Sequence, residues 1–456
     1  MANDRWLYAL ALSSVASGIA GLLVPLYLVR IGAGAAALGI TAALSSLVGA
    51  PGAILAGGYA DRTGRRRGVV LFGLIVSVLA IGLIPLLESV TVVIVVNAVL
   101  WIALAAIGPI VTMLIVQDQP EERWADRIAQ LNKYQGYGGT AGLVIGTIWT
   151  GTVALTIGPA MAQRSLFVLA ALIGVASAFL AVRYLPPEAR LSVGAGRSGR
   201  IATILFRTNR RVRDATFAFG GNRFFWAFRS LPRDRIKRLR ENVPTVLWTY
   251  FIAAFLFFAG FAVFWAPLPL YLTDLGLLSG SIFALYLVNN IASTVLYSGA
   301  GRATSQYDVR YVQGGALGLR AGAFVMIGVF GVLGLGTIVD GQLGVLLVIG
   351  AILAVIGMTW AFIAVTGVSI VSRFAPQATR GGILGLYAAL SAIAGSLGSL
   401  AGGWLATISF PLAFGVAAAL VVCGGSLVLA TKRLARAEEM STTDSDVETA
   451  SIPPDD

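Results

Sequence analysis

Histidine is absent from this 456-residue sequence, and cysteine occurs once, at Cys423. Without histidine the chain can form no histidine proton relay, no histidine metal site and no Ser-His or Cys-His catalytic pair. A single cysteine permits no disulfide within the chain, so we expect Cys423 to be a small packing residue. Charged residues are also scarce, at 12% of the chain. Few groups remain from which an active site could be built.

Motifs of nucleotide and ester chemistry are missing as well. The sequence contains no Walker loop, no G-x-S-x-G elbow and no pair of catalytic carboxylates. ATP-driven transport and hydrolysis therefore have no candidate site in this chain. We expect no enzymatic activity, no cofactor and no metal site.

Apolar residues dominate: 57% of the chain is hydrophobic, and the mean hydropathy is +0.84. This share is far above that of soluble domains. A helix needs about 20 apolar residues to cross a bilayer. The sequence therefore predicts an all-α integral membrane protein with twelve transmembrane helices. Their approximate spans are 6–29, 36–60, 68–88, 91–116, 131–157, 164–185, 244–272, 279–303, 312–336, 342–371, 380–408 and 410–431.

The two halves of the chain repeat each other. PLYLVRIG at residues 25–32 matches PLYLTDLG at residues 269–276, an offset of 244 (269 − 25). A second set of matching residues has an offset of 256 (376 − 120). It aligns Pro120, Gly139, Gly142 and Gly146 with Pro376, Gly395, Gly398 and Gly402. The seventh span is thus a copy of the first, and the eleventh a copy of the fifth. Such repeats indicate the fold before any single residue does.

A short charged turn separates the second and third spans, and its residues 57–66 read G-x-x-x-D-R-x-G-R-R. This string resembles the signature of the loop between helices 2 and 3 in the major facilitator superfamily, whose members are secondary transporters. The resemblance implies two pseudo-symmetric six-helix bundles. It also implies that Asp61 caps the start of helix 11, near Thr379 to Gly382, and favours an outward-open state.

The other residues of this turn have mechanical roles under the same resemblance. Gly57 and Gly58 would let another helix approach closely, and Gly64 would support a tight turn. The arginines would face phospholipid headgroups or the acids of the following loop between helices 4 and 5; they are Arg62, Arg65 and Arg66. A plain basic membrane anchor is the alternative. Ser305 replaces Asp61 in the second half, so we expect an asymmetric latch.

Basic residues set the predicted orientation. Only Arg30 and Arg164 lie on one side of the spans, which leaves 31 of the 33 lysines and arginines (33 − 2) on the side of both termini. Both termini are therefore expected to be cytoplasmic. We expect a multi-pass protein of the plasma membrane that acts as a monomer.

Four segments follow from these patterns: a six-helix bundle at 1–185, a basic and aromatic-rich cytoplasmic linker at 186–243, a second bundle at 244–431 and a disordered acidic tail at 432–456. The linker composition suits binding to anionic lipid headgroups. Nucleic-acid binding is the alternative, but the positive-inside bias already accounts for these charges, so we expect no nucleic-acid partner.

Small residues at a spacing of four form two rows, which are predicted to pack between the bundles. The rows are Gly138, Gly142 and Gly146 in the fifth span, and Gly395, Ser399 and Gly403 in the eleventh. The fifth span also resembles the family's antiporter signature G-x-x-x-G-P. Leu143 stands in place of the proline, so the sequence does not support an antiporter assignment.

Polar and aromatic residues inside the spans are candidates for contact with a small-molecule substrate, because polar groups are costly in lipid. The candidates are Asn97, Trp101, Trp265, Tyr286, Asn289, Asn290 and Trp360. Each has an alternative structural role, since asparagines join helices by hydrogen bonds and tryptophans pack or anchor at interfaces.

Charges inside the membrane are nearly absent. All acidic residues fall in loops or at span ends, which argues against proton coupling through a buried carboxylate. Arg320 is the exception among basic residues, about eight residues into the ninth span. We expect its long side chain to snorkel to the cytoplasmic surface rather than bind an anion.

The sequence as a whole favours a secondary active or facilitative transporter of a small solute that works by rocker-switch alternating access. Drug or metabolite efflux is the alternative within the same fold, suggested by the phenylalanine-rich seventh span. A non-transporting membrane receptor or scaffold is the alternative from a different class.

Overall fold

The computed structural model describes residues 4–116, 119–186, 245–332, 341–376 and 380–450. Within these ranges no strand occurs, and twelve helical spans are long and apolar enough to cross a membrane. The predicted all-α, twelve-span architecture is therefore confirmed. Apart from Pro186, the predicted linker at 186–243 lies outside the described residues.

The first bundle comprises six spans, two of which continue through short irregular turns. Its elements are α1 (Trp6–Arg30), α2 (Ala35–Thr63), α3 (Arg66–Leu83) with η1 (Ile84–Leu86), α4 (Val90–Val116), α5 (Glu121–Ile148) with η2 (Trp149–Val153) and α6 (Ala154–Ile157), and α7 (Pro159–Tyr184).

The second bundle repeats this plan. Its elements are α11 (Thr245–Trp265) with α12 (Leu268–Asp274), α13 (Ser279–Gln306), α14 (Val309–Val332), α16 (Gly341–Phe374), α17 (Arg380–Ile408) and α18 (Phe410–Ala450). Pro267 separates α11 from α12, because proline lacks the backbone N–H that a continuous helix needs.

Two helix boundaries differ from the sequence expectation. Helix α5 begins at Glu121, ten residues before the predicted start at 131, because its first turns are too polar to register as a membrane span. Helix α18 continues to Ala450, where the sequence predicts a disordered tail from residue 432. Residues 433–440 read RLARAEEM, which consists almost wholly of strong helix formers, and this composition explains the extension.

Both halves end their first span in the same backbone conformation. Gly32 and Gly276, the last residues of the repeated octapeptide, have φ angles of +91° and +80°, which only glycine adopts without strain. The close helix contacts repeat too: a Cβ on Gly142 would meet the Val15 carbonyl oxygen. At the equivalent place in the second half, a Cβ on Gly398 would meet the backbone of α11. The internal repeat read from the sequence is thus present in three dimensions.

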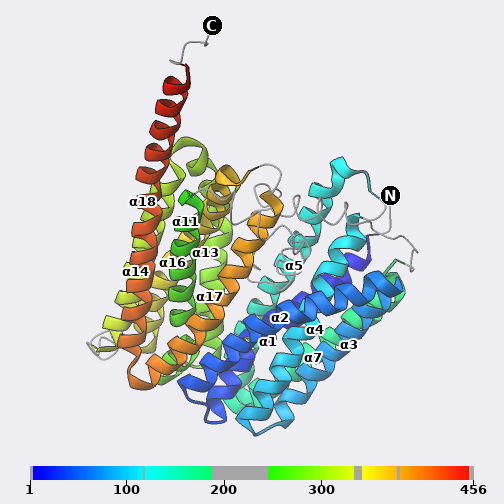
Figure 1. Cartoon of the computed structure of the whole chain (residues 1–456). Helices are drawn as coiled ribbons and strands as arrows, with labels where there is room; N and C mark the ends of the chain where they lie inside the picture. Colours follow the sequence, from blue (N-terminus) through cyan, green and yellow to red (C-terminus); the bar gives the residue numbers. More distant parts are fainter. Residues whose placement is uncertain (1–3, 117–118, 187–244, 333–340, 377–379, 451–456) are drawn as a thin grey trace.

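The two bundles meet at one end and diverge at the other. Figure 1 shows them in contact at the end away from the marked termini and apart at the end that carries both. One continuous buried apolar cluster joins the second bundle to the far half of the first, including Leu26, Leu38 and Phe167. The terminal half of the first bundle has its own separate cluster, around Trp6 and Trp124. We call the contacting end the distal end and the other the terminal end.

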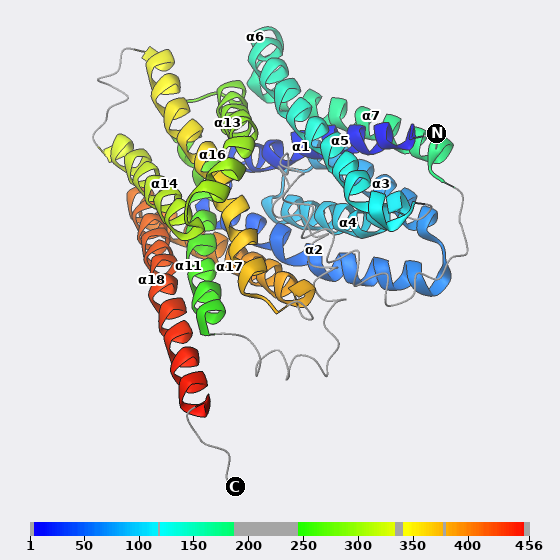
Figure 2. The same cartoon turned by 90° about the horizontal axis from the view of Figure 1, so that it is seen from above.

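Helix order within the second bundle decides which side chains can face the first. Helices α13 and α17 touch α5 and α2 of the first bundle, while α14 packs on α16 and α18. In Figure 2, α14 and α18 lie on the side facing away from the first bundle, with α11 and α16 nearer to it.

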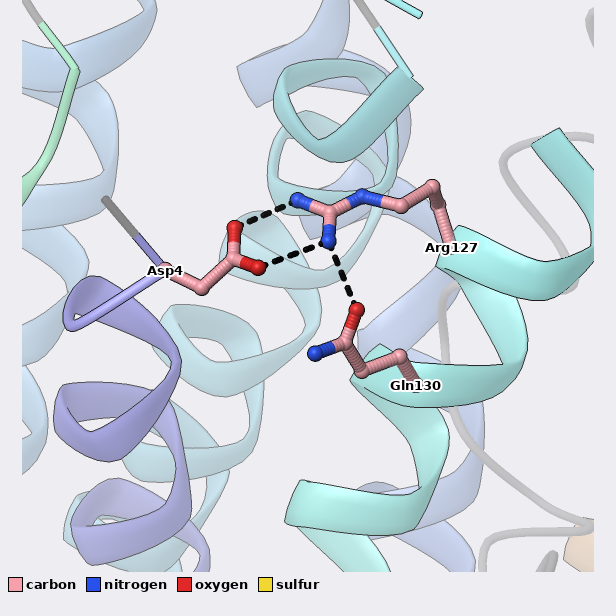
Figure 3. A network of polar contacts seen from close by, with 3 residues as sticks. All are labelled: Asp4, Arg127 and Gln130. Atoms are coloured by element: carbon pink, nitrogen blue, oxygen red, sulfur yellow. Dashed lines mark hydrogen bonds and ion pairs between the residues drawn. The ribbon is translucent and has the colours of Figure 1, made fainter. Parts of the chain in front are cut away.

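An ion pair fixes the terminal end of the first bundle (Figure 3). The Arg127 guanidinium on α5 donates to both carboxylate oxygens of Asp4, at 2.8 and 2.5 Å, and to Oε1 of Gln130 at 2.7 Å. This guanidinium holds the pKa of the Asp4 carboxyl below its usual value. The pair ties the residues before α1 to the beginning of α5.

Candidate functional site

Glycines of α2 and α17 bring the backbones of the two bundles into direct contact at the distal end. A Cβ on Gly39 would lie 2.6 Å from the Ser399 carbonyl oxygen and 2.8 Å from the Gly403 Cα. A Cβ on Gly403 would lie 2.7 Å from both the Ala35 carbonyl oxygen and the Gly39 Cα. The two backbones touch here, and no larger residue fits without moving the bundles apart.

A second contact joins α5 and η2 to α13. A Cβ on Gly280 would lie 2.8 Å from the Cα of Gly151, which belongs to the π-helical turn η2. Gly146 faces the ring of Phe283 in the other bundle. Turns of π-helix are rare and occur often at functional sites. Here the turn brings a glycine of η2 against a glycine of α13.

Side-chain hydrogen bonds between described residues also cross between the bundles. The Gln163 amide on α7 donates to the Ser279 hydroxyl at 2.7 Å, and the Thr140 hydroxyl on α5 donates to Asn290 Oδ1 at 3.2 Å. Asn290 is therefore the candidate substrate residue that the structure places directly at the junction of the bundles.

The predicted rows of small residues divide between two different interfaces. Gly146, Ser399 and Gly403 lie against the other bundle, as described above. Gly138 and Gly142 instead pack on α1 of their own bundle, so the expectation of inter-bundle packing is wrong for these two. A Cβ on Gly395 would meet nothing within 4 Å. The spacing showed which helix faces carry only small residues, but not which neighbouring helix packs against each face.

The signature turn lies at the terminal end, at the junction of α2 and α3. Gly64 ends α2 with a φ of +72°, as a tight turn requires. A Cβ on Gly58 would meet nothing within 4 Å, so no other helix lies against it in this state. Gly57 is buried, and Arg62 and Arg65 are exposed. Arg66 is only 4% exposed, so the headgroup alternative is wrong for it, while contact with the acids of the loop between helices 4 and 5 stays a prediction.

The predicted latch falls largely beyond what can be described. The side chain of Asp61 and its expected target Thr379 lie outside the described part of the chain. The backbone places Asp61 in the last turns of α2, while α17 begins at Arg380.

Two candidate asparagines join helices within a bundle. Asn97 on α4 donates to the Ser45 hydroxyl of α2 at 3.0 Å, and Asn289 on α13 donates to the Leu353 carbonyl of α16 at 2.9 Å. Each therefore has the structural role that the sequence left open. In the first bundle Trp101 is half-buried on α4.

The aromatic candidates of the second bundle lie near a larger group of rings. Trp265 and Tyr286 form an edge contact with centroids 5.3 Å apart. The ring centroids of Phe258 and Phe261 on α11 lie 6.5 and 6.2 Å from the ring centroid of Trp360 on α16. Phe258, Phe261 and Trp360 come from α11 and α16. These two helices lie nearer to the first bundle than α14 and α18 do (Figure 2).

Arg320 lies within this aromatic group, and the expectation that it snorkels is wrong. The residue is 2% exposed, about halfway along α14. Its Cζ lies 4.2 Å from the ring centroid of Phe261, 5.6 Å from that of Trp360 and 5.8 Å from that of Phe324. Because α14 begins at Val309, three residues earlier than predicted, Arg320 lies deeper than the sequence implied.

The sequence analysis also missed a polar group beside these rings. Gln313, fully buried one heptad before Arg320, donates to the Tyr250 hydroxyl at 2.9 Å. Tyr250 stacks with Tyr387 at a centroid distance of 6.1 Å. The seven-residue spacing of Gln313 and Arg320, which puts both on one helix face, was the available signal.

Comparison with known proteins agrees with this geometry. No curated protein matches the sequence significantly. A mutant of the nucleoside transporter NupG shares the fold with a TM-score of 0.70 and 13% identity, over 94% of this chain and 99% of that one. The POT family transporter PepTSo has a TM-score of 0.63 and 12% identity, over 96% and 99%. The human organic anion transporter TETRAN has a TM-score of 0.51 and 17% identity, over 93% and 98%.

Identities this low indicate a shared fold and nothing about substrate. The family assignment comes from the sequence itself, because the model of the Major Facilitator Superfamily matches residues 6–398. Together with the twelve apolar helices and their two repeated bundles, this match identifies the chain as a membrane protein that belongs to the Major Facilitator Superfamily of transporters.

Proposed function

We propose that this protein moves a small solute across the membrane by rocker-switch alternating access, with the solute held between residues 1–185 and 244–431. The observation that carries the proposal is the distribution of contacts. Glycine backbones of the two bundles touch at the distal end, between Gly39 and Gly403 and between Gly151 and Gly280. At the terminal end the bundles diverge (Figure 1).

Contacts between glycine backbones suit an interface that has to open during transport. At the points where glycine backbones meet, no side chains interlock, and lipid provides no hydrophobic drive to hold the helices together. The hydrogen bond from Gln163 to Ser279 adds a polar contact between the bundles at the same end.

The direction in which this state opens follows from the proposed topology. The excess of basic residues on the side of both termini favours a cytoplasmic location for that side and insertion in the plasma membrane. The state described here is then open to the cytoplasm. We further propose that the chain acts as a monomer, and that the basic linker at 186–243 lies on anionic lipid headgroups.

A reversible lock on the distal end tests the proposal. In a Cys423→Ser background, Gln163→Cys and Ser279→Cys place one thiol on each bundle, at the two residues that the 2.7 Å hydrogen bond joins. A short thiol-specific cross-linker with a reducible bridge should stop solute exchange in proteoliposomes, and reduction should restore it. Each single-cysteine variant is the matched control. Solute exchange that continues in fully cross-linked protein would rule out opening of this gate.

Topology is tested separately with a cysteine at Ser198 in the same background. A membrane-impermeant maleimide should label it in inside-out vesicles but not in intact cells. Labelling in intact cells would reverse the orientation, and this state would then be open to the outside.

A further inference from the structure

Arg320 is a buried cation that forms no ion pair with any carboxylate in the described part of the chain. Its Nε and Nη1 atoms are buried and have no hydrogen-bond partner among the described residues. The sequences of α11, α13, α14 and α16 contain no aspartate or glutamate. The four helices that surround this guanidinium therefore offer it no counter-charge, and a bound anion would supply one.

The aromatic contacts do not remove the need for an anion. Rings of Phe261, Phe324 and Trp360 attract the guanidinium through their π faces. This attraction offsets only part of the cost of dehydrating a cation in a membrane-spanning bundle. The N–H groups on Nε and Nη1, which have no partner among the described residues, lie in the guanidinium plane, and donors of this kind bind oxyanions strongly.

The position of Arg320 connects it to the proposed solute path. Helix α14 lies on the side of the second bundle that faces away from the first (Figure 2). The guanidinium nevertheless points toward Phe261 on α11 and Trp360 on α16, the nearer pair of helices. Trp360, on the nearer helix α16, is only partly buried, which leaves part of its ring accessible beside the cation.

We propose that the transported solute is an organic anion, and that Arg320 binds its carboxylate, phosphate or sulfonate group. This inference rests on the proposed transport function. The anionic group pairs with the guanidinium after displacement of the Trp360 side chain. The apolar or aromatic body of the solute packs on Phe258, Phe261 and Trp360. Arginine, which is charged at every physiological pH, makes this recognition insensitive to pH.

Binding to purified full-length protein tests the inference without any transport step. The probes are benzoate, phenyl phosphate and benzenesulfonate, with benzamide and benzyl alcohol as neutral matches. They are titrated in Tris buffer of low chloride content and followed by calorimetry and thermal shift. At least one anion should bind saturably while the neutral compounds do not. Arg320→Gln should weaken that binding about 10- to 100-fold, because it removes a charge-assisted hydrogen-bonded pair. Arg320→Lys should recover part of the affinity.

Arg302→Gln, the same change at an exposed arginine of α13, is the matched control and should bind as wild type does. Equal binding by Arg320→Gln, equal binding of the neutral matches, or no saturable binding of any of the three anions would overturn the inference. A chloride titration that gives the same Arg320-dependent shift would assign the site to a resident inorganic ion and overturn it too.

Failure of the transport proposal is recognised by a different result. Anions that bind through Arg320 but never cross proteoliposome membranes would leave the anion site standing and refute transport of these anions. If wild type and Arg320→Gln carried a neutral solute equally well, transport would be supported and the anion site at Arg320 would be refuted.

Discussion

Tyr27 and Tyr271 hold equivalent places in the two halves and make equivalent hydrogen bonds. The Tyr27 hydroxyl donates to the Leu87 carbonyl at 2.6 Å, at the distal end of α3 and η1. The Tyr271 hydroxyl donates to the Ile327 carbonyl on α14 at 2.7 Å. Each tyrosine therefore ties the distal end of the first helix of its half to the third, and the repeated PLYL string has a structural role in both bundles.

Replacing either tyrosine with phenylalanine should destabilise its bundle by a similar amount. Both tyrosines are buried, and removing either hydroxyl deletes one buried hydrogen bond, at a cost of about 1 kcal/mol. Thermal unfolding of Tyr27→Phe and Tyr271→Phe in detergent should show comparable decreases in Tm. Tyr307→Phe, at a residue 67% exposed, is the control and should leave the Tm unchanged. A decrease in one half only would mean that the two hydrogen bonds are not equivalent.

The repeat and the helix count were predictable because they depend on spacing and hydropathy alone. Octapeptides 244 residues apart end in Gly32 and Gly276, and both glycines adopt the same left-handed turn. Twelve spans follow from runs of about 20 apolar residues. The start of α5 was missed because Glu121 and the polar residues after it precede the apolar run.

The site was less predictable, because a sequence gives the depth of a residue in a helix but not the direction in which it points. Arg320 was expected to reach the surface, and it turns instead toward Phe261 and Trp360, which belong to two other helices. Gly142 shows the same limit: its spacing indicates a narrow face, and only the fold shows that α1 occupies it.

Acidic pH should remove the contribution of the Asp4–Arg127 pair. Arg127 holds the pKa of Asp4 below its usual value of 3.8, so the charged pair stabilises the protein above about pH 4 and is lost as the pH falls through the lowered value. Near neutral pH, Asp4→Asn should lower the free energy of unfolding by about 0.2–1 kcal/mol, the range for partly exposed pairs. Unfolding measured from pH 7 to pH 3 should show the difference from wild type shrinking toward the acid end.

Glu88→Gln is the control for this measurement. Glu88 lies 3.7 Å from Arg164 but is 85% exposed, so its pair should contribute nothing measurable at any pH. A difference between Asp4→Asn and wild type that stays constant down to pH 3 would mean that the Asp4 charge is not what stabilises the contact.

Adding one methyl group at Gly39 should open the distal end. In Gly39→Ala the new Cβ would lie 2.6 Å from the Ser399 carbonyl oxygen, and a backbone atom cannot give way as a side chain can. Overpacking of this kind costs about 1–3 kcal/mol, and it should disfavour the distally closed state by roughly tenfold. Spin labels at Leu86 and Leu343, which are 77% and 67% exposed on opposite bundles, should show longer distances.

Gly395→Ala on α17 is the matched control, since a Cβ there meets nothing within 4 Å. It should leave the Leu86–Leu343 distance distribution as in wild type. Unchanged distances in Gly39→Ala would mean that α2 and α17 accommodate the methyl group by sliding along each other rather than by moving apart.

Asp61→Asn should shift the same equilibrium in the opposite direction. By the family resemblance, the Asp61 carboxylate faces the positive end of α17 when the terminal side is closed, an interaction of about 1–2 kcal/mol. Removing the charge should favour the state that is closed at the distal end by roughly 5- to 30-fold. The Leu86–Leu343 pair should then report a larger share of short distances, and solute exchange should fall while expression is kept. Ser305→Ala should change neither, because the second half carries no carboxylate at the equivalent position. Wild-type distances together with wild-type exchange in Asp61→Asn would leave the charged turn as a membrane anchor only, because an anchor requires the arginines and not the aspartate.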